Sequence, residues 1–318
     1  AGAGGGGRRR RQGRGMTRRL ETVLATVDWA HCVLRVTGAT SGYALDGNRS
    51  GLFARYLRGD NSPRLFDVIY RDAPMPGNDT AIRFFHPLYA VLGRSPSDRD
   101  LTHALVAASR RVHTRVFDTS GAIYPSNALR PVTSRRLLDL AVQGDGFALT
   151  TLIAYLFMAM RGRDPALALE AGLRAWQCLL LAVASGEFAA IGRLLGARLR
   201  QQVLNQVTHQ DQTWDTATPD LGVIIPALRL AVPELAIAAG ASRRRLIRDL
   251  LESPSDDMRA LLVPERVSVA EAQHRRQAHR RTLDLDGPPR GRLQELPRLG
   301  AKARAIARAA FYPNWVET

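Results

Sequence analysis

The sequence predicts an α+β fold, with a mostly antiparallel N-terminal sheet packed on a larger helical part that is built around one central apolar helix. Two observations lead to this prediction. Between residues 30 and 117, short runs of β-branched and aromatic residues alternate with turn residues. From residue 118 to residue 240, apolar residues recur at helical spacing. With 318 residues, of which 45% are hydrophobic, the chain can bury the core of one large domain.

Composition divides the chain into three parts. Residues 1–19 are rich in glycine and arginine, which is typical of a disordered basic arm, and they lack the apolar run of a secretory signal. Residues 20–240 form the predicted α+β domain, sheet-rich over 30–117 and helical over 118–240. Residues 241–318 are predicted to form a basic helical extension with a polar linker.

Three segments predict the N-terminal sheet. After a short helix at 20–30, the run CVLRV at 32–36 indicates a strand. RLFDVIYR at 64–71 is the clearest strand, because it combines aromatic and β-branched residues. TAIRFF at 80–85 is the next strand, after a turn that contains proline and glycine.

Capping residues and apolar spacing predict several helices after residue 97. Ser97 is a suitable N-cap for the helix that follows it. The segment 221–240 is apolar, but Pro226 and Pro233 interrupt it, so it predicts packed short helices and no membrane span. Helices are expected over about 98–111, 134–140, 147–160 and 242–253.

The stretch from Asp164 to Gln202 is predicted to be the central helix. Asp164 and Pro165 form a helix start, and apolar residues then dominate both faces, which is typical of a core helix. One carboxylate, Glu187, follows the apolar run LLLAVAS. An ionisable group in that position needs a partner or a function. It is therefore either a structural ion pair with an arginine or an acid beside a surface that binds polyanions.

The net charge of +16 indicates a nucleic-acid partner. Of the 45 basic residues only Lys302 is a lysine, so 44 are arginines. Guanidinium groups match phosphate geometry and stack on bases. Codon bias in a GC-rich genome explains arginine in place of lysine, but it does not explain the excess of basic over acidic residues.

The sequence lacks the motifs of several enzyme classes. No glycine-rich nucleotide-binding loop and no nucleophile elbow is present. The seven histidines show no zinc-binding spacing, and Cys32 and Cys178 are expected to be free thiols. No metal and no cofactor is therefore predicted.

The order of scattered features over about residues 30–235 resembles the ribosome-inactivating proteins, the ricin A-chain and Shiga toxin A-chain family of rRNA N-glycosylases. RLFDVIYR resembles the strand with the first adenine-stacking tyrosine, which places Phe66 in that role without the hydroxyl. The loop GAIY places Tyr124 in the role of the second. LLLAVASGEFAAIG resembles the catalytic helix, with Glu187 as the acid. Trp214 lies where the family has a tryptophan that lines the pocket.

The chain departs from this family at the arginine that assists the leaving base. The family places it three residues after the glutamate, where this chain has Ala190. The nearest arginine after Glu187 is Arg193, which is on a different face of an ideal helix. A second alignment pairs Glu170 with Arg174, one turn apart. Glu187 with Arg193 is the expected catalytic pair, and Glu170 with Arg174 is the alternative.

The resemblance implies removal of an adenine from a ribosomal RNA loop. The aromatic residues would sandwich the unstacked base, and the carboxylate would stabilise the oxocarbenium charge on the ribose. The alternative is a non-enzymatic nucleic-acid-binding structural protein, such as a viral capsid or nucleocapsid subunit, that also self-associates. The enzyme needs its residues to converge on one pocket, whereas the structural protein needs a continuous basic surface.

Overall fold

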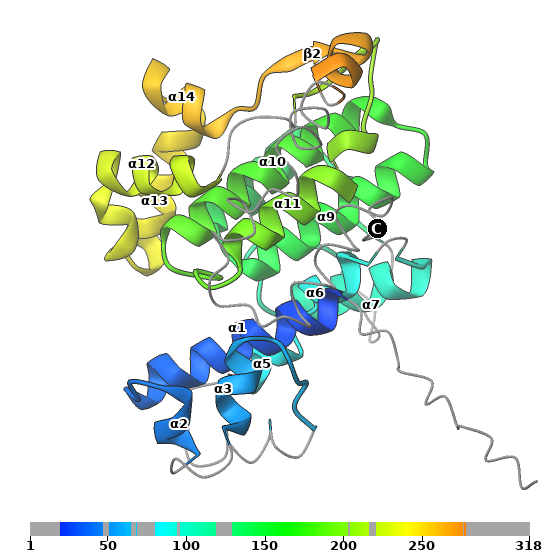
Figure 1. The fold of residues 1–318 in the computed structure, drawn as a ribbon. Helices are drawn as coiled ribbons and strands as arrows, with labels where there is room; N and C mark the ends of the chain where they lie inside the picture. Colours follow the sequence, from blue (N-terminus) through cyan, green and yellow to red (C-terminus); the bar gives the residue numbers. More distant parts are fainter. Residues whose placement is uncertain are drawn as a thin grey trace, which may run out of the picture.

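The computed structural model shows a chain made mostly of helices (Figure 1). Two short strands form its small antiparallel sheet, so the fold is α+β only in a coarse sense. The residues that the structure describes are 20–46, 51–64, 68, 80–93, 96–118, 129–202, 204–215, 221–275 and 277.

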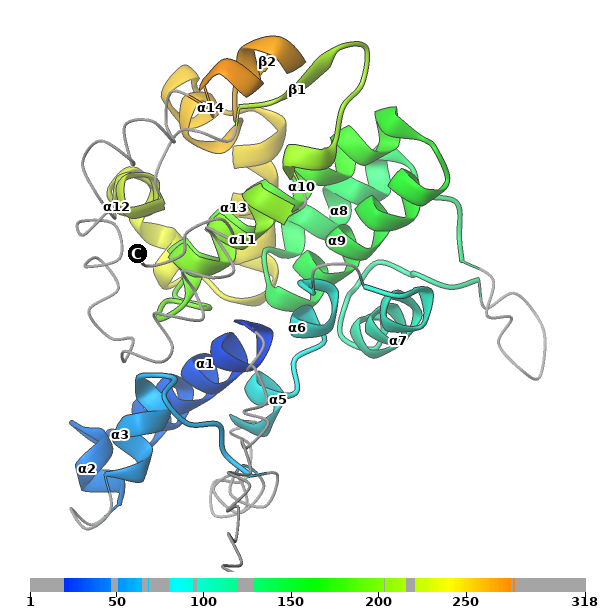
Figure 2. The ribbon, with the colours of Figure 1, turned by 45° about the vertical axis from the view of Figure 1, so that its right-hand side comes forward.

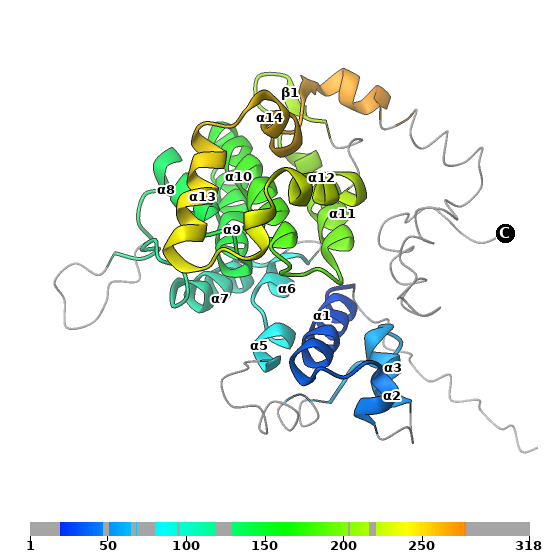
Figure 3. The same ribbon diagram turned by 90° about the vertical axis from the view of Figure 1, so that its left-hand side faces the viewer.

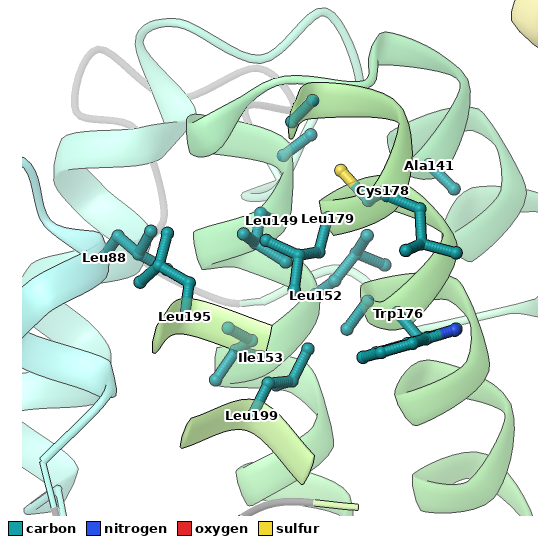
Figure 4. Close-up of a cluster of buried hydrophobic side chains, with 14 of the residues drawn as sticks. Leu88, Ala141, Leu149, Leu152, Ile153, Trp176, Cys178, Leu179, Leu195 and Leu199 are labelled. Carbon is teal, nitrogen blue, oxygen red and sulfur yellow. The ribbon is translucent and has the colours of Figure 1, made fainter. Parts of the chain in front are cut away.

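The body of the molecule is organised around two long helices, α9 (Gly146–Arg161) and α10 (Pro165–Ala184), which pack along each other. Three further helices, α8 (Ser134–Gln143), α11 (Gly192–Gln202) and α12 (Leu221–Ala231), pack against α10. Figure 4 shows leucines of α9, α10 and α11 meeting between the helices. Both α9 and α10 are apolar on nearly every face because they are surrounded by other helices.

The predicted single helix from Asp164 to Gln202 is wrong in its second half. Its start is confirmed, since the Asp164 side chain accepts a hydrogen bond from the Leu167 N–H and Pro165 is the first residue of α10. The helix ends at Ala184, where Gly186 adopts a left-handed conformation with φ 92°. The chain then turns and begins α11, so Glu187 lies in a turn between two helices.

The described residues of the N-terminal part are helical, so the predicted N-terminal sheet is wrong at 32–36 and 80–85. Its elements are α1 (Leu20–Thr37), α2 (Gly42–Leu45), α3 (Leu52–Leu57) and α5 (Thr80–Phe84). Figure 2 shows these helices as a group beside the body, next to the short helix α6 (Leu88–Val91).

Packing explains why the expected strands at 32–36 and 80–85 are helices. In α1 the side chains of Trp29, Ala30 and Val33 are buried, and Val33 follows the other two at spacings of four and three, which is the helical period. The β-branched valines favour a strand only weakly, and the tertiary contacts outweigh this preference. The rings of Phe53, Tyr56 and Phe84 pack around Trp29. Most of the third predicted strand, at 64–71, falls outside the described residues.

The helices predicted over 98–111, 134–140, 147–160 and 242–253 are confirmed. In α7 (Asp98–Ser109), Ser97 is the N-cap and forms a reciprocal capping box with Asp100. The predicted helices over 134–140 and 147–160 are α8 and α9, and the basic helix after residue 240 is α13 (Gly240–Glu252). The apolar segment 221–240 forms two short helical elements, α12 and the 3-10 helix η2 (Pro233–Ala236), as predicted. Pro233 begins η2, but Pro226 lies inside α12 and does not interrupt it, so that part of the prediction is wrong.

The C-terminal elements of the described chain cover one end of α10. Helix α14 (Asp256–Leu262) packs on α10 and α12. Beside it, β1 (Gln212–Trp214) pairs antiparallel with β2 (Arg266–Ser268). The 3-10 helix η1 (Leu204–Gln206) leads from α11 towards β1.

Helix α10 is the one helix in the described part of the chain that is long and apolar enough to cross a membrane. Its apolar window is 72% buried inside the fold, as in the core helix of a protein without a membrane span. The apolar character of α10 is therefore accounted for by its contacts within the body.

The N-terminal helices are joined to the body partly through Arg198. This α11 side chain is buried and donates to Glu21 Oε1 of α1 at 2.9 Å and to the Leu92 carbonyl at 3.1 Å. We expect Arg198→Met to lower the free energy of unfolding by about 3 kcal/mol, because both acceptors lose a buried charged donor. Urea unfolding measures this change. The exposed Arg193→Met on the same helix should cost less than about 1 kcal/mol; equal losses in the two variants would contradict the buried role of Arg198.

Candidate functional site

Glu187 is held by the N-terminal end of α9 and by an arginine from α5. Its Oε1 lies 3.0 Å from Arg83 Nη1, and the two side chains are only 15% and 20% exposed. The carboxylate also accepts a hydrogen bond from the Gly146 backbone N–H in the first turn of α9. The partner of Glu187 is thus Arg83, 104 residues away in the sequence, and no local spacing could have indicated it.

A second carboxylate, Asp28 of α1, lies near this pair. Its Oδ2 accepts a 3.0 Å hydrogen bond from the Tyr89 hydroxyl of α6. Burial raises the pKa of Asp28 to about 6, although Arg83 acts in the opposite direction. Burial also raises the pKa of Glu187, again against the effect of Arg83. Two carboxylates therefore share the field of one buried guanidinium where the N-terminal helices meet the body.

His86 lies next to this cluster as a neutral, buried imidazole. Its Nδ1 accepts a hydrogen bond from the Leu88 N–H at 3.1 Å, so the proton is on Nε2. The ring packs on Phe147, with centroids 4.4 Å apart, and edge-on to Phe188. Burial lowers the pKa of His86 to about 3, and Arg83 acts in the same direction. This histidine is a packing element and does not exchange protons near neutral pH.

The alternative pair, Glu170 and Arg174, lies on α10 but its members bind other groups. Glu170 Oε2 accepts from the Ser134 hydroxyl at 2.7 Å. Arg174 Nη1 donates to Gln177 Oε1 at 3.0 Å. Burial lowers the pKa of Arg174, against the effect of Glu170 and Glu252. The two side chains share a face, as their spacing predicts, without forming an ion pair with each other among the described residues.

Trp214 lies at the other end of α10 from Glu187. It is 2% exposed, and the Arg266 guanidinium covers its ring at 5.0 Å from the centroid. Its indole nitrogen faces Gly172, which is twelve residues before the end of α10 and therefore about 18 Å from that end. Trp214 lines a separate hollow of about 620 Å³ with residues of α14 and β2. The structure does not bring Trp214 and Glu187 into one pocket.

The other residues of the proposed glycosylase site are not brought to Glu187 in the described part of the chain. Arg193 is exposed on α11, and its guanidinium packs against Gly222 at the start of α12. Phe66 and Tyr124 lie outside the described residues, so their positions relative to Glu187 stay predictions. The resemblance to the glycosylase family is left with one observed feature, a carboxylate paired with a guanidinium.

Basic residues gather where the segment after α7 meets the start of α13, which packs on α8. Figure 3 shows the backbone of α7, α8 and α13. We call this region the α7–α13 basic surface. Arg244 Nη1 and His113 Nε2 lie 3.1 Å apart across it, although the two residues are 131 positions apart in the sequence. We define it as the basic residues of the two segments that this contact joins: Arg110, Arg111, His113, Arg115, Arg243, Arg244 and Arg245.

The backbone under this surface is fixed by Gln143 at the end of α8. Its Oε1 accepts from the His113 N–H at 2.9 Å, and its Nε2 donates to the Arg111 carbonyl at 3.1 Å. Arg243 Nη2 donates to the Gly144 carbonyl at 2.6 Å, and the Arg111 guanidinium lies 6.0 Å from the Phe147 ring centroid. Several of these cations are therefore held in place before any ligand binds.

Carboxylates do not neutralise the outer part of this surface. In the described ranges, Arg110, Arg115 and Arg245 have no ion pair within 4.0 Å. Further along α13 the situation differs, because Arg248 pairs with Asp139 at 2.9 Å and with Glu252 at 3.2 Å. The unpaired arginines are thus concentrated at the start of α13 and the end of α7.

No group of His, Cys, Asp and Glu side chains in the described part of the chain is arranged to hold a metal ion. Comparison with protein-family models, with curated proteins and with solved structures finds no match to this chain. Function must therefore be argued from the sites themselves.

The raised pKa of Asp28 predicts a specific pH dependence of stability. Between its ordinary value of 3.8 and about 6, the folded chain keeps a proton on Asp28 that the unfolded chain has lost. This contribution to stability is present below about pH 4 and is lost as the pH rises through about 6. The difference corresponds to about 3 kcal/mol, at 1.36 kcal/mol per pKa unit. His86 works in the opposite direction, because its lowered pKa contributes stability that is lost as the pH falls from 6.5 towards about 3.

Comparison with Asp28→Asn separates the two effects, because His86 is common to both proteins. Asparagine does not titrate and still accepts a hydrogen bond from the Tyr89 hydroxyl. We expect the stability of the wild type relative to the variant to fall by up to about 3 kcal/mol between about pH 4 and about pH 7. Urea unfolding at several pH values measures it. Parallel stability curves would contradict the raised pKa.

Proposed function

We propose that this chain is a non-enzymatic nucleic-acid-binding protein that contacts the phosphate backbone through the α7–α13 basic surface. The supporting observation is the meeting of Arg244 and His113 at 3.1 Å, with Arg110, Arg115 and Arg245 close by in the two segments and without an ion pair among the described residues. Bringing so many cations together costs free energy through like-charge repulsion, which a polyanion relieves. The net charge of +16 acts in the same direction over longer distances.

The geometry of the surface suits a phosphate backbone. Guanidinium groups donate two parallel hydrogen bonds to a phosphate, and those fixed on backbone carbonyls lose less entropy on binding. The first turn of α13 adds partial positive charge, because its N-cap, Ala239, makes no side-chain capping bond. Nothing in the surface recognises base edges, so we expect binding with little sequence preference and a strong dependence on salt.

The test is fluorescence anisotropy with a labelled DNA duplex of mixed sequence over a range of salt concentrations. We expect a triple variant, Arg110→Gln with Arg115→Gln and Arg245→Gln, to weaken binding and to reduce the slope of log K against log salt by roughly 2 to 3. That reduction is about 0.9 for each lost phosphate contact on B-DNA.

The matched control is a second triple variant, Arg99→Gln with Arg163→Gln and Arg259→Gln, which removes the same charge from exposed positions elsewhere. It should leave the salt slope nearly unchanged. Equal losses in the two variants would show that overall charge, and not the α7–α13 basic surface, determines binding.

A second candidate function is the rRNA N-glycosylase activity, supported by the Arg83–Glu187 pair. This pair places a guanidinium 3.0 Å from the carboxylate, a combination that depurination chemistry uses. Arg83 would take the role expected of Arg193, and Trp214 would have no part. The raised pKa of Glu187 is compatible with acid–base chemistry, but the same arrangement also suits a purely structural pair.

A depurination assay tests this second candidate. Ribosomes are incubated with the protein, and their RNA is treated with aniline to cleave at abasic sites. The glycosylase proposal expects one discrete fragment that Glu187→Gln abolishes, whereas Glu170→Gln retains it. A fragment that survives Glu187→Gln would move the acid to another residue, and no fragment with ribosomes from several sources would exclude the activity.

A further inference from the structure

Helix α12 and the 3-10 helix η2 expose large apolar side chains to solvent. Val223 is 67% exposed, Leu230 is 86% exposed, and Ile237, directly after η2, is 83% exposed. They are the three most exposed of the large hydrophobic residues that the structure describes, and they lie within fifteen positions. Element η2, which Ile237 follows, packs on α12, and we call these three exposed positions the α12–η2 apolar face.

The helical geometry of α12 shows that this exposure is systematic. One face of α12 is buried in the core through Leu221, Ile224, Ile225 and Leu228. At 100° per residue, Val223, Pro226 and Leu230 project from the opposite face. The helix is therefore apolar on both faces although only one face is covered within the body. An exposed apolar face of this kind is expected where another apolar surface, outside this part of the chain, covers it.

The charges around this face are mainly positive. Within residues 221–241 the charged side chains are Arg229 and Glu234. The Arg229 guanidinium donates to the Val183 and Ala184 carbonyls at the end of α10. Arg193 packs against Gly222 at the start of α12, and Glu234 in η2 is exposed. Two guanidinium groups and one carboxylate therefore lie along α12 and η2.

We propose that the α12–η2 apolar face inserts into the surface layer of an anionic lipid membrane, as a peripheral contact that does not span the bilayer. Charge complementarity selects this occupant. A second copy of the chain would bring the flanking arginines of both copies together. The C-terminal segment 299–312 is itself basic, with Lys302, Arg304 and Arg308. Nucleic acid neutralises arginines but offers no apolar layer, whereas anionic lipids supply both negative headgroups and hydrocarbon.

The membrane contact is tested by vesicle flotation with the full chain freed of nucleic acid. We expect binding to vesicles of phosphatidylcholine with about 30% phosphatidylserine and much weaker binding to phosphatidylcholine alone. The double variant Leu230→Gln with Ile237→Gln should lower the partition coefficient at least about ten-fold, because two apolar side chains no longer enter the hydrocarbon. Both positions are largely exposed, so the substitutions leave the core unchanged.

The control is Phe85→Gln, which removes an exposed aromatic side chain (51% exposed) outside the α12–η2 apolar face and should leave vesicle binding unchanged. Failure to bind anionic vesicles would overturn the proposal. So would vesicle binding that the double variant retains in full, since the arginines alone would then account for it. A wild-type dimer that the double variant converts to a monomer, without loss of vesicle binding, would instead assign the face to a second copy.

Discussion

The packing of α9 against α10 is the interaction on which the rest of the structure depends. Both helices are apolar on nearly all faces, so each needs to be covered on every side. The helices α8, α11 and α12 provide that cover for α10, and α7 covers α9. The turn after α10 follows from the same requirement, because the chain must reverse to lay α11 on the core. That reversal brings Glu187 to the first turn of α9, where it meets Arg83.

Arginine has two distinct roles in this fold, and composition does not separate them. Some guanidinium groups are structural, as when Arg198 joins α11 to α1 and Arg229 covers the last carbonyls of α10. Others project from the surface without carboxylate partners in the described ranges, as Arg110 and Arg245 do. The first group resists salt because it is buried, whereas the second responds to salt and attracts polyanions. The proposed contact with nucleic acid depends on this second group.

The comparison with glycosylases shows how a shared order of residues differs from a shared site. A pattern spread over two hundred residues requires those residues to converge, and their convergence depends on the fold. Here the expected strands around Cys32 and Ile82 are helices, the proposed catalytic helix ends before Glu187, and Trp214 is buried at the far end of α10. The same carboxylate nevertheless has an arginine partner, which the local spacing did not predict. The sequence can therefore identify an unusual carboxylate correctly without identifying the residues that contact it in the fold.

The sequence alone predicted the helices whose starts, ends and apolar spacing depend on their own residues. Ser97, Asp164 and Pro165 define helix starts, Pro233 separates η2 from α12, and the spacing of leucines predicts α8, α9 and α13. At the N-terminus the first part of α1 was predicted, but its continuation through 32–36 and helix α5 were not, because β-branched residues favour a strand until Trp29 and its aromatic neighbours bury a helical face. Only the tertiary structure decided which arginines are buried in ion pairs and which remain at the surface, and that Glu187 would meet Arg83. Such contacts join residues more than a hundred positions apart, and their free energy exists only after the core has formed.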